Sequence, residues 1–161
     1  MAPFGCGQRY NITGLIHDET GFPTNSTEEA AKLMDRLMRK ISDNYDDIVQ
    51  CEQVSLDDAE MVIVCYGGTM RAARSAMEQA RASGKKVGIF RPITIWPFPE
   101  RELREVLGKA KRVLVVEHNG GQLLLEIERI VKGACPVDFI GRLNGTVITP
   151  QDILTKLEEV E

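Results

Sequence analysis

Short apolar runs alternate with helical stripes through most of the chain. Met61–Tyr66 (MVIVCY) and Arg112–Glu117 (RVLVVE) are nearly continuous apolar runs, as expected of strands buried on both faces of a sheet. Lys86–Arg91 and Val137–Ile140 are two more strands, and Glu52–Ser55 is a possible short one. The pattern therefore predicts about five strands.

Helical periodicity follows most of these strands. The predicted helices cover residues 69–83, 99–107, 122–132 and 149–157. Strands and helices that alternate at these lengths imply parallel strands joined by right-handed crossovers. The predicted fold class is α/β, a three-layer α/β/α sandwich with a mostly parallel sheet of about five strands.

The N-terminal segment has a different pattern. Residues 1–25 are rich in Gly, Pro and Asn, and only Tyr10–Ile16 is strand-like, so we expect an extended linker or arm from an upstream domain. Ser26 and Glu29 form a capping-box pattern before apolar residues at helical spacing, which predicts a connecting helix within residues 26–48. The α/β domain is expected to occupy residues 49–161.

Composition narrows the function classes. The 161 residues carry a net charge of −4, which argues against a nucleic-acid partner. The longest apolar run is too short to span a bilayer, and no basic-plus-apolar signal segment begins the chain, so no membrane partner and a cytoplasmic location are expected. The four cysteines match no zinc, redox or cluster spacing, and Cys65 is expected to be a buried thiol.

The turns after the predicted strands are the first candidate site, because ligands of open α/β sheets usually bind at the carboxyl ends of the strands. Glycine-rich turns that lead into helices can offer free backbone N–H groups to an anion, and nearby arginines can add charge. The alternative is that the glycines only permit tight turns and close packing. The candidate anion-binding residues are Gly67, Gly68, Thr69, Arg91, His118, Asn119, Gly120, Gly121 and Arg142.

Other residues suggest chemistry less strongly. Glu117 and His118 could form an acid–base pair, although neighbouring strand residues point to opposite faces. His17 and Asp18 are expected to lie in a hydrogen-bonded turn or a subunit contact rather than a metal site. Trp96 and Phe98, in a W-P-F-P loop, either pack over the domain edge or form an exposed subunit interface.

Three stretches together resemble one protein family. They are NITGLIHDETGFP (11–23), VGIFRPITIWPFPERELREVL (87–107) and VLVVEHNGGQLLLEIE (113–128). In this order they resemble the alpha subunit of 2-oxoacid:ferredoxin oxidoreductases, particularly the 2-oxoglutarate and branched-chain oxoacid types. The resemblance covers the junction and a second domain that is similar to the transketolase C-terminal domain, with one antiparallel strand near residues 50–55.

The resemblance also implies a reaction for the complete complex. Such a complex decarboxylates a 2-oxoacid to an acyl-CoA and passes the electrons to ferredoxin, using thiamine diphosphate, magnesium, an iron–sulfur cluster and coenzyme A. This chain has no diphosphate motif and no cluster cysteines, so we expect no cofactor and no catalytic residue in it. Its expected role is assembly with the other subunits and domains, or a homodimer. The alternative is an autonomous module that binds an anion, a nucleotide or coenzyme A, while a stand-alone enzyme using Glu117 and His118 has no support beyond residue type.

Overall fold

The computed structural model describes residues 3–9 and 12–160. The chain divides into two units, Met1–Asp47 and Ile48–Glu161, and each is considered by itself. The strands are β1 (Ile16–His17), β2 (Pro23–Thr24), β3 (Cys51–Val54), β4 (Met61–Cys65), β5 (Val87–Pro92), β6 (Arg112–Glu117) and β7 (Val137–Gly141). The helices are α1 (Thr27–Ser42), α2 (Tyr45–Ile48), α3 (Thr69–Ala82), α4 (Glu100–Leu107), α5 (Gln122–Val131) and α6 (Pro150–Glu159).

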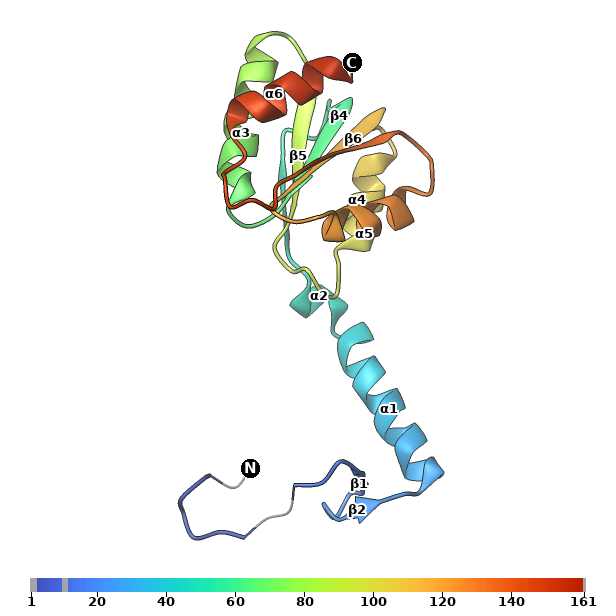
Figure 1. Cartoon of the computed structure of the whole chain (residues 1–161). Coiled ribbons are helices and arrows are strands. Elements are labelled where there is room, and N and C mark those ends of the chain that lie inside the picture. The colour runs from blue at the N-terminus through green and yellow to red at the C-terminus, as the bar shows by residue number, and fades with distance from the viewer. Residues whose placement is uncertain (1–2, 10–11, 161) are drawn as a thin grey trace. The chain divides into compact units, whose positions relative to one another are not determined.

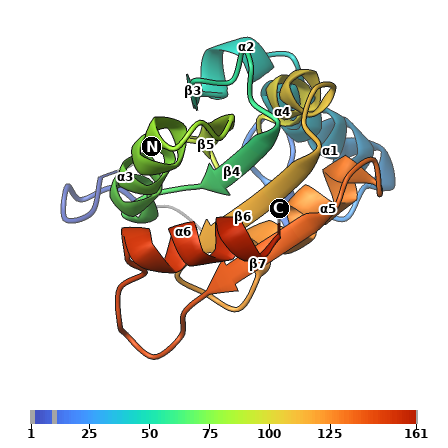
Figure 2. The ribbon, with the colours of Figure 1, turned by 90° about the horizontal axis from the view of Figure 1, so that it is seen from above.

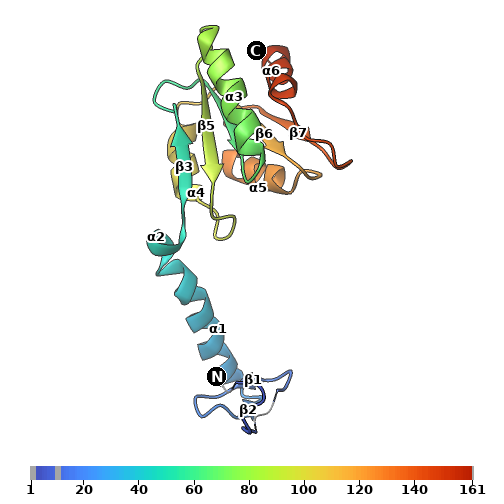
Figure 3. The ribbon, with the colours of Figure 1, turned by 90° about the vertical axis from the view of Figure 1, so that its left-hand side faces the viewer.

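The second unit is built on a five-stranded sheet in the order β3-β5-β4-β6-β7. Figure 1 shows its inner strands β5, β4 and β6. The four strands β4 to β7 are parallel, and Ile63 pairs with Ile89 on one side and Leu114 on the other. Strand β3 is an edge strand antiparallel to β5, and β7 forms the opposite edge (Figure 3). The predicted fold class and the antiparallel strand implied by the family resemblance are both confirmed.

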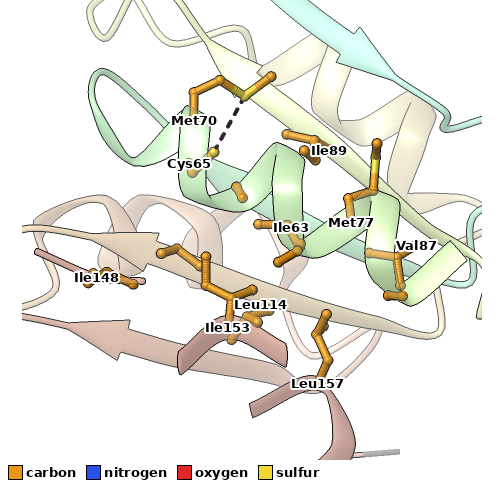
Figure 4. Close-up of a cluster of buried hydrophobic side chains, with 14 residues drawn as sticks. Ile63, Cys65, Met70, Met77, Val87, Ile89, Leu114, Ile148, Ile153 and Leu157 are labelled. Atoms are coloured by element: carbon orange, nitrogen blue, oxygen red, sulfur yellow. Dashed lines mark hydrogen bonds between the residues drawn. The ribbon is translucent and has the colours of Figure 1, made fainter. Parts of the chain in front are cut away.

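Helices cover both faces of this sheet (Figure 2). On one face α3 and α6 pack on the side chains of Ile63, Ile89 and Leu114, which are fully buried (Figure 4). On the other face α4 and α5 pack on Val64 and Val115. Because strand side chains alternate between faces, each continuous apolar run supplies both cores, as expected for a strand buried on both sides.

The N-terminal unit has no comparable core among its described residues. Strands β1 and β2 form a small antiparallel ladder in which Ile16 pairs with Thr24. Helix α1 begins after Ser26, whose hydroxyl accepts a hydrogen bond from the backbone N of Glu29 at 3.3 Å. No residue of α1 is buried. Across the described residues, we find no helix that is both long and apolar enough to cross a membrane.

Two local predictions differ from the structure. The strand-like segment Tyr10–Ile16 contributes only Ile16 to β1; residues 12–15 lie outside any strand, and residues 10 and 11 lie outside the described part of the chain. Where one connecting helix was predicted within residues 26–48, the structure has two, α1 and the single-turn helix α2. Alternation over a short polar stretch is weak evidence for a strand, because no buried face fixes it.

Candidate functional site

The turns predicted to bind a ligand follow the carboxyl ends of β4, β5, β6 and β7. Because these strands are parallel, their ends lie at one edge of the sheet. The structure thus brings the candidate residues to the same edge. The hydrogen bonds they make determine whether any of them is available to a ligand.

In the turn after β6, the chain satisfies its own helix N-terminus. The Asn119 side-chain oxygen accepts hydrogen bonds from the backbone N of Gly121 at 2.8 Å and of Gln122 at 3.0 Å. The Glu117 carboxylate accepts from the backbone N of Leu123 and Leu124, both at 3.0 Å. These are the N–H groups that begin α5, where a helix usually lacks partners. The prediction of a free donor is therefore wrong for Gly121, whereas an anion at Gly120 stays a prediction.

Glu117 and His118 do not form an acid–base pair. Glu117 is fully buried on the α5 face of the sheet, in line with Val113 and Val115. His118 is exposed, and its Nε2 accepts a long hydrogen bond of 3.5 Å from the backbone N of Ile148. A carboxylate held by helix N–H groups is not available to a substrate. The hypothesis of a stand-alone enzyme that uses Glu117 and His118 as an acid–base pair is therefore not supported.

The turn after β4 differs from the turn after β6. Gly67 has a positive φ of 58°, which glycine adopts without strain. The Thr69 hydroxyl donates to the backbone oxygen of Tyr66 at 2.6 Å. No side chain caps α3, and its first turn contains no acidic residue. An anion at Gly67, Gly68 and Thr69 therefore stays a prediction.

The two arginines predicted to add positive charge at this edge are each paired with a carboxylate. Arg91 contacts Glu52 on β3 at 3.0 Å, and Glu52 also binds Arg74 at 2.7 Å. Arg142 contacts Asp152 at 2.7 Å, within the capping box that begins α6. Asp152 balances the charge of Arg142, but the single carboxylate of Glu52 is shared by Arg91 and Arg74, and the buried Nε of Arg91 has no hydrogen-bond partner among the described residues. A ligand at Arg91 therefore stays a prediction.

Trp96 and Phe98 have different environments. Trp96 is 73% exposed, whereas Phe98 is 8% exposed and belongs to the core between the sheet and helices α4 and α5. The interface prediction is wrong for Phe98, because its ring packs inside the domain, and remains a prediction for Trp96. Thr94 anchors the loop: its hydroxyl donates to the backbone oxygen of Ile48 at 3.0 Å and accepts from the backbone N of Gln50 at 3.0 Å. Sequence analysis gave no sign of this anchor.

The turn between β1 and β2 is hydrogen-bonded around Asp18. Its Oδ1 accepts from the backbone N of Thr20 at 2.9 Å and of Phe22 at 3.2 Å, and from the Thr20 hydroxyl. The Thr20 hydroxyl bond is the main reason that the pKa of Asp18 lies below its ordinary value. His17 lies 3.2 Å from the Thr13 hydroxyl. The expected turn is present, and the subunit contact stays a prediction.

The described residues include no group of three or more His, Cys, Asp or Glu side chains placed to hold a metal ion. Cys65 is fully buried, as predicted, and burial raises the pKa of its thiol to about 12. A buried thiol with a raised pKa is not suited to act as a thiolate nucleophile, so Cys65 has no such role.

Exposed apolar side chains surround the same edge of the sheet. They belong to the loop after β5, the first turn of α5 and the loop after β7: Ile93, Ile95, Trp96, Leu125, Leu143 and Val147. A Cβ atom on Gly120 would lie 3.8 Å from the Cδ1 of Leu143, so this loop contacts the turn after β6. Several polar groups at this edge are thus bonded within the chain, while several apolar side chains are exposed.

Comparison with known proteins places the chain in a family. The family model for pyruvate:ferredoxin oxidoreductase core domain II matches residues 59–153. The chain is 38% identical over 158 residues to 2-oxoglutarate synthase subunit KorA of Methanothermobacter marburgensis, an alignment that covers 98% of this chain and 42% of the relative. It is 36% identical over 155 residues to ketoisovalerate oxidoreductase subunit VorB of Methanothermobacter thermautotrophicus, covering 96% and 43%.

Solved structures agree with this result. The chain superposes with a TM-score of 0.81 and 26% identity on 2-oxoglutarate:ferredoxin oxidoreductase from Magnetococcus marinus, a structure with 2-oxoglutarate, coenzyme A and succinyl-CoA bound; the match covers 99% of this chain and 28% of that one. A split-gene transketolase shares the fold, with a TM-score of 0.58 and 16% identity. That match covers 67% of this chain and 40% of the transketolase chain.

The family resemblance inferred from the sequence is thereby confirmed. The chain spans about two fifths of the length of the curated relatives it matches. It belongs to the pyruvate:ferredoxin oxidoreductase core domain II family, in the form found in alpha subunits of 2-oxoacid:ferredoxin oxidoreductases.

Proposed function

We propose that this chain is an assembly domain of a 2-oxoacid:ferredoxin oxidoreductase. In this role it packs against other subunits and domains of the enzyme and contributes no catalytic residue. The complete complex would convert 2-oxoglutarate or a branched-chain 2-oxoacid to an acyl-CoA and reduce ferredoxin. Thiamine diphosphate, magnesium, an iron–sulfur cluster and coenzyme A would be held by other parts of that complex.

One observation carries the proposal: the edge of the sheet that usually binds ligands exposes apolar side chains, while several of its polar groups are bonded within the chain. Glu117 and Asn119 accept hydrogen bonds from backbone N–H groups at the start of α5, and Arg142 is paired with Asp152. The side chains left exposed there are apolar, Trp96 and Leu143 at 73% and 81% among them. An exposed aromatic group with apolar neighbours is typical of a protein interface.

The test has two parts. The purified chain, supplied with 2-oxoacid, thiamine diphosphate, magnesium and coenzyme A, should reduce no ferredoxin. It should bind the remaining polypeptides of the oxidoreductase, and Trp96→Ala should weaken that binding by about 10-fold or more, as removal of an exposed aromatic hot spot does. Lys109→Ala, at an exposed polar position, is the matched control. Turnover by the chain alone, or equal affinities for both variants, would contradict the proposal.

A second candidate function has one observation in its favour. The N-terminus of α3 lacks a side-chain cap and has no acidic residue in its first turn, so the turn at Gly67, Gly68 and Thr69 is a candidate place for an anion. A thermal-shift screen with coenzyme A, nucleotides and thiamine diphosphate tests this role, because a ligand of the folded state raises the melting temperature with its concentration. No shift at millimolar ligand would count against an autonomous binding module.

A further inference from the structure

The buried carboxylate of Glu117 has a specific bonding pattern. Glu117 is fully buried, and each of its oxygens accepts a hydrogen bond from a backbone N–H of α5: Oε1 from Leu124 and Oε2 from Leu123, both at 3.0 Å. Oε2 also accepts from the Asn119 side-chain amide at 2.6 Å. A buried carboxylate without such partners would be strongly unfavourable. Three donors and the positive end of α5 make this position complementary to a carboxylate.

Asn119 connects this carboxylate to a second strand end. The same side-chain amide that binds Glu117 also donates to the Tyr66 hydroxyl at 2.9 Å. Tyr66 directly follows β4, whereas Glu117 ends β6. The Glu117–Asn119–Tyr66 network therefore ties the glycine turn after β6 to the start of the glycine turn after β4.

We propose that Glu117 is a built-in anionic ligand of the α5 N-terminus. It occupies the position that a bound anion would take and fixes the turn of residues 118–121 in place. The space that its side chain fills is accordingly a site for a small monocarboxylate, which formate or acetate occupies once the side chain is removed. The sheet edge is then permanently formed rather than assembled by a ligand. The inference does not depend on the proposed assembly role.

The matched control for this site is Val115. It lies two residues earlier on β6, faces the same core and is also fully buried. Truncation of Val115 leaves an apolar cavity, whereas truncation of Glu117 leaves N–H donors without a partner. Only the second space should attract a carboxylate, because empty apolar cavities do not bind polar solutes.

The experiment compares melting temperatures of the full chain and its Glu117→Ala and Val115→Ala variants in sodium acetate and in sodium chloride at equal ionic strength. Glu117→Ala should lower the melting temperature by roughly 10 °C in chloride, since two buried N–H groups lose their acceptor. About 100 mM acetate should restore about 3 °C in this variant alone, for a dissociation constant on the order of 10 mM. Equal acetate responses in Glu117→Ala and Val115→Ala would overturn the proposal.

Three further measurements test the proposal. Amide NMR signals of Leu123 and Leu124 should shift in Glu117→Ala and return towards their original positions as acetate is added. Glu117→Gln fills the space and should be less stable than the original chain without responding to acetate. If Glu117→Ala does not fold in chloride, it should refold from denaturant in acetate or formate. Failure to refold in either carboxylate would also overturn the proposal.

Discussion

The two units of the chain use the same local signals for helices but differ in what they bury. Helix α1 in the N-terminal unit and helix α6 in the α/β unit both begin with a hydroxyl side chain that accepts a hydrogen bond from a backbone N–H. Helix α6 buries Ile153 and Leu157 completely, while α1 buries no residue. A capped, amphipathic pattern therefore predicts a helix well, but it does not tell whether the apolar face is covered within the chain.

The difference has a consequence for stability. Most of the stability of a helix in a protein comes from packing of its apolar face, not from propensity or caps. The α/β unit has two cores, one on each face of the sheet. We therefore expect global unfolding of the chain to report on the α/β unit, with little contribution from residues 3–47. Matched substitutions in the two units test this expectation.

The largest difference is expected for leucine truncations. Leu114 is fully buried between β4, α3 and α6, so Leu114→Ala should lower the free energy of unfolding by about 2–5 kcal/mol. Leu37 on α1 is 44% exposed, so Leu37→Ala should stay within about 0.5 kcal/mol. Urea unfolding followed by circular dichroism measures both. A loss of several kcal/mol for Leu37→Ala would show that α1 is packed within the chain.

Glycine substitutions should give the next largest difference. A Cβ on Gly88 in β5 would lie 2.6 Å from the Cδ2 of Leu56 and 2.7 Å from the backbone oxygen of Ser55, so Gly88→Ala forces the segment after β3 to move. We expect a loss of about 1–3 kcal/mol. Gly14 has no heavy atom within 4 Å of such a Cβ and no positive φ, so Gly14→Ala should be near neutral. The same urea series measures both, and similar losses would contradict the comparison.

Removal of the helix caps should have a smaller effect. In α6, Thr149 and Asp152 form a complete capping box, with the Thr149 hydroxyl accepting from the backbone N of Asp152 at 3.2 Å. Thr149→Ala should cost about 1 kcal/mol in urea unfolding. Ser26→Ala removes the cap of α1 and should only reduce helical circular dichroism in the folded chain, leaving the urea midpoint unchanged. A shift of that midpoint by Ser26→Ala would refute the separation of the two units.

Much of the fold was predictable because apolar runs such as Met61–Tyr66 have few alternatives: a short, fully apolar segment must be buried. The antiparallel direction of β3 could not be predicted from the residue pattern, because the sequence of a short four-residue strand does not depend on its direction in the sheet. Only the family resemblance indicated it. Phe98 was ambiguous because a W-P-F-P loop gives no sign of which aromatic ring turns inward.

The candidate site was predicted less well than the fold. The spacing of Val113, Val115 and Glu117 places this carboxylate on the same face of β6 as the two valines, in a run that predicts burial on both faces. That spacing could have predicted a buried partner for the helix that follows. The role of Asn119 could not be inferred, because its four hydrogen bonds depend on the path of the turn and on Tyr66, which is 53 residues away in the sequence. The local residue pattern predicts helices and strands, whereas hydrogen bonds between segments far apart in the sequence can be identified only once the fold is known.

The smallest difference between the two units is expected in their contributions to stability at acid pH. Each unit contains an aspartate with a lowered pKa, Asp18 in the first and Asp152 in the second. In Asp152 the backbone N–H of Thr149 is the largest cause, followed by its hydroxyl and by Arg142; in Asp18 the hydroxyl of Thr20 is the largest. A carboxylate whose pKa is lowered by folding stabilises the folded state fully at a pH above its ordinary pKa of 3.8. This contribution is lost as the pH falls through the pKa of the folded state. Asp152→Asn should therefore lose less stability than the unmodified chain between pH 6 and pH 3, whereas Asp18→Asn should follow the unmodified chain. Urea midpoints at the two pH values measure this, and a reduced acid loss in Asp18→Asn instead would mean that the β1–β2 turn, not the α6 cap, contributes to the cooperative unit.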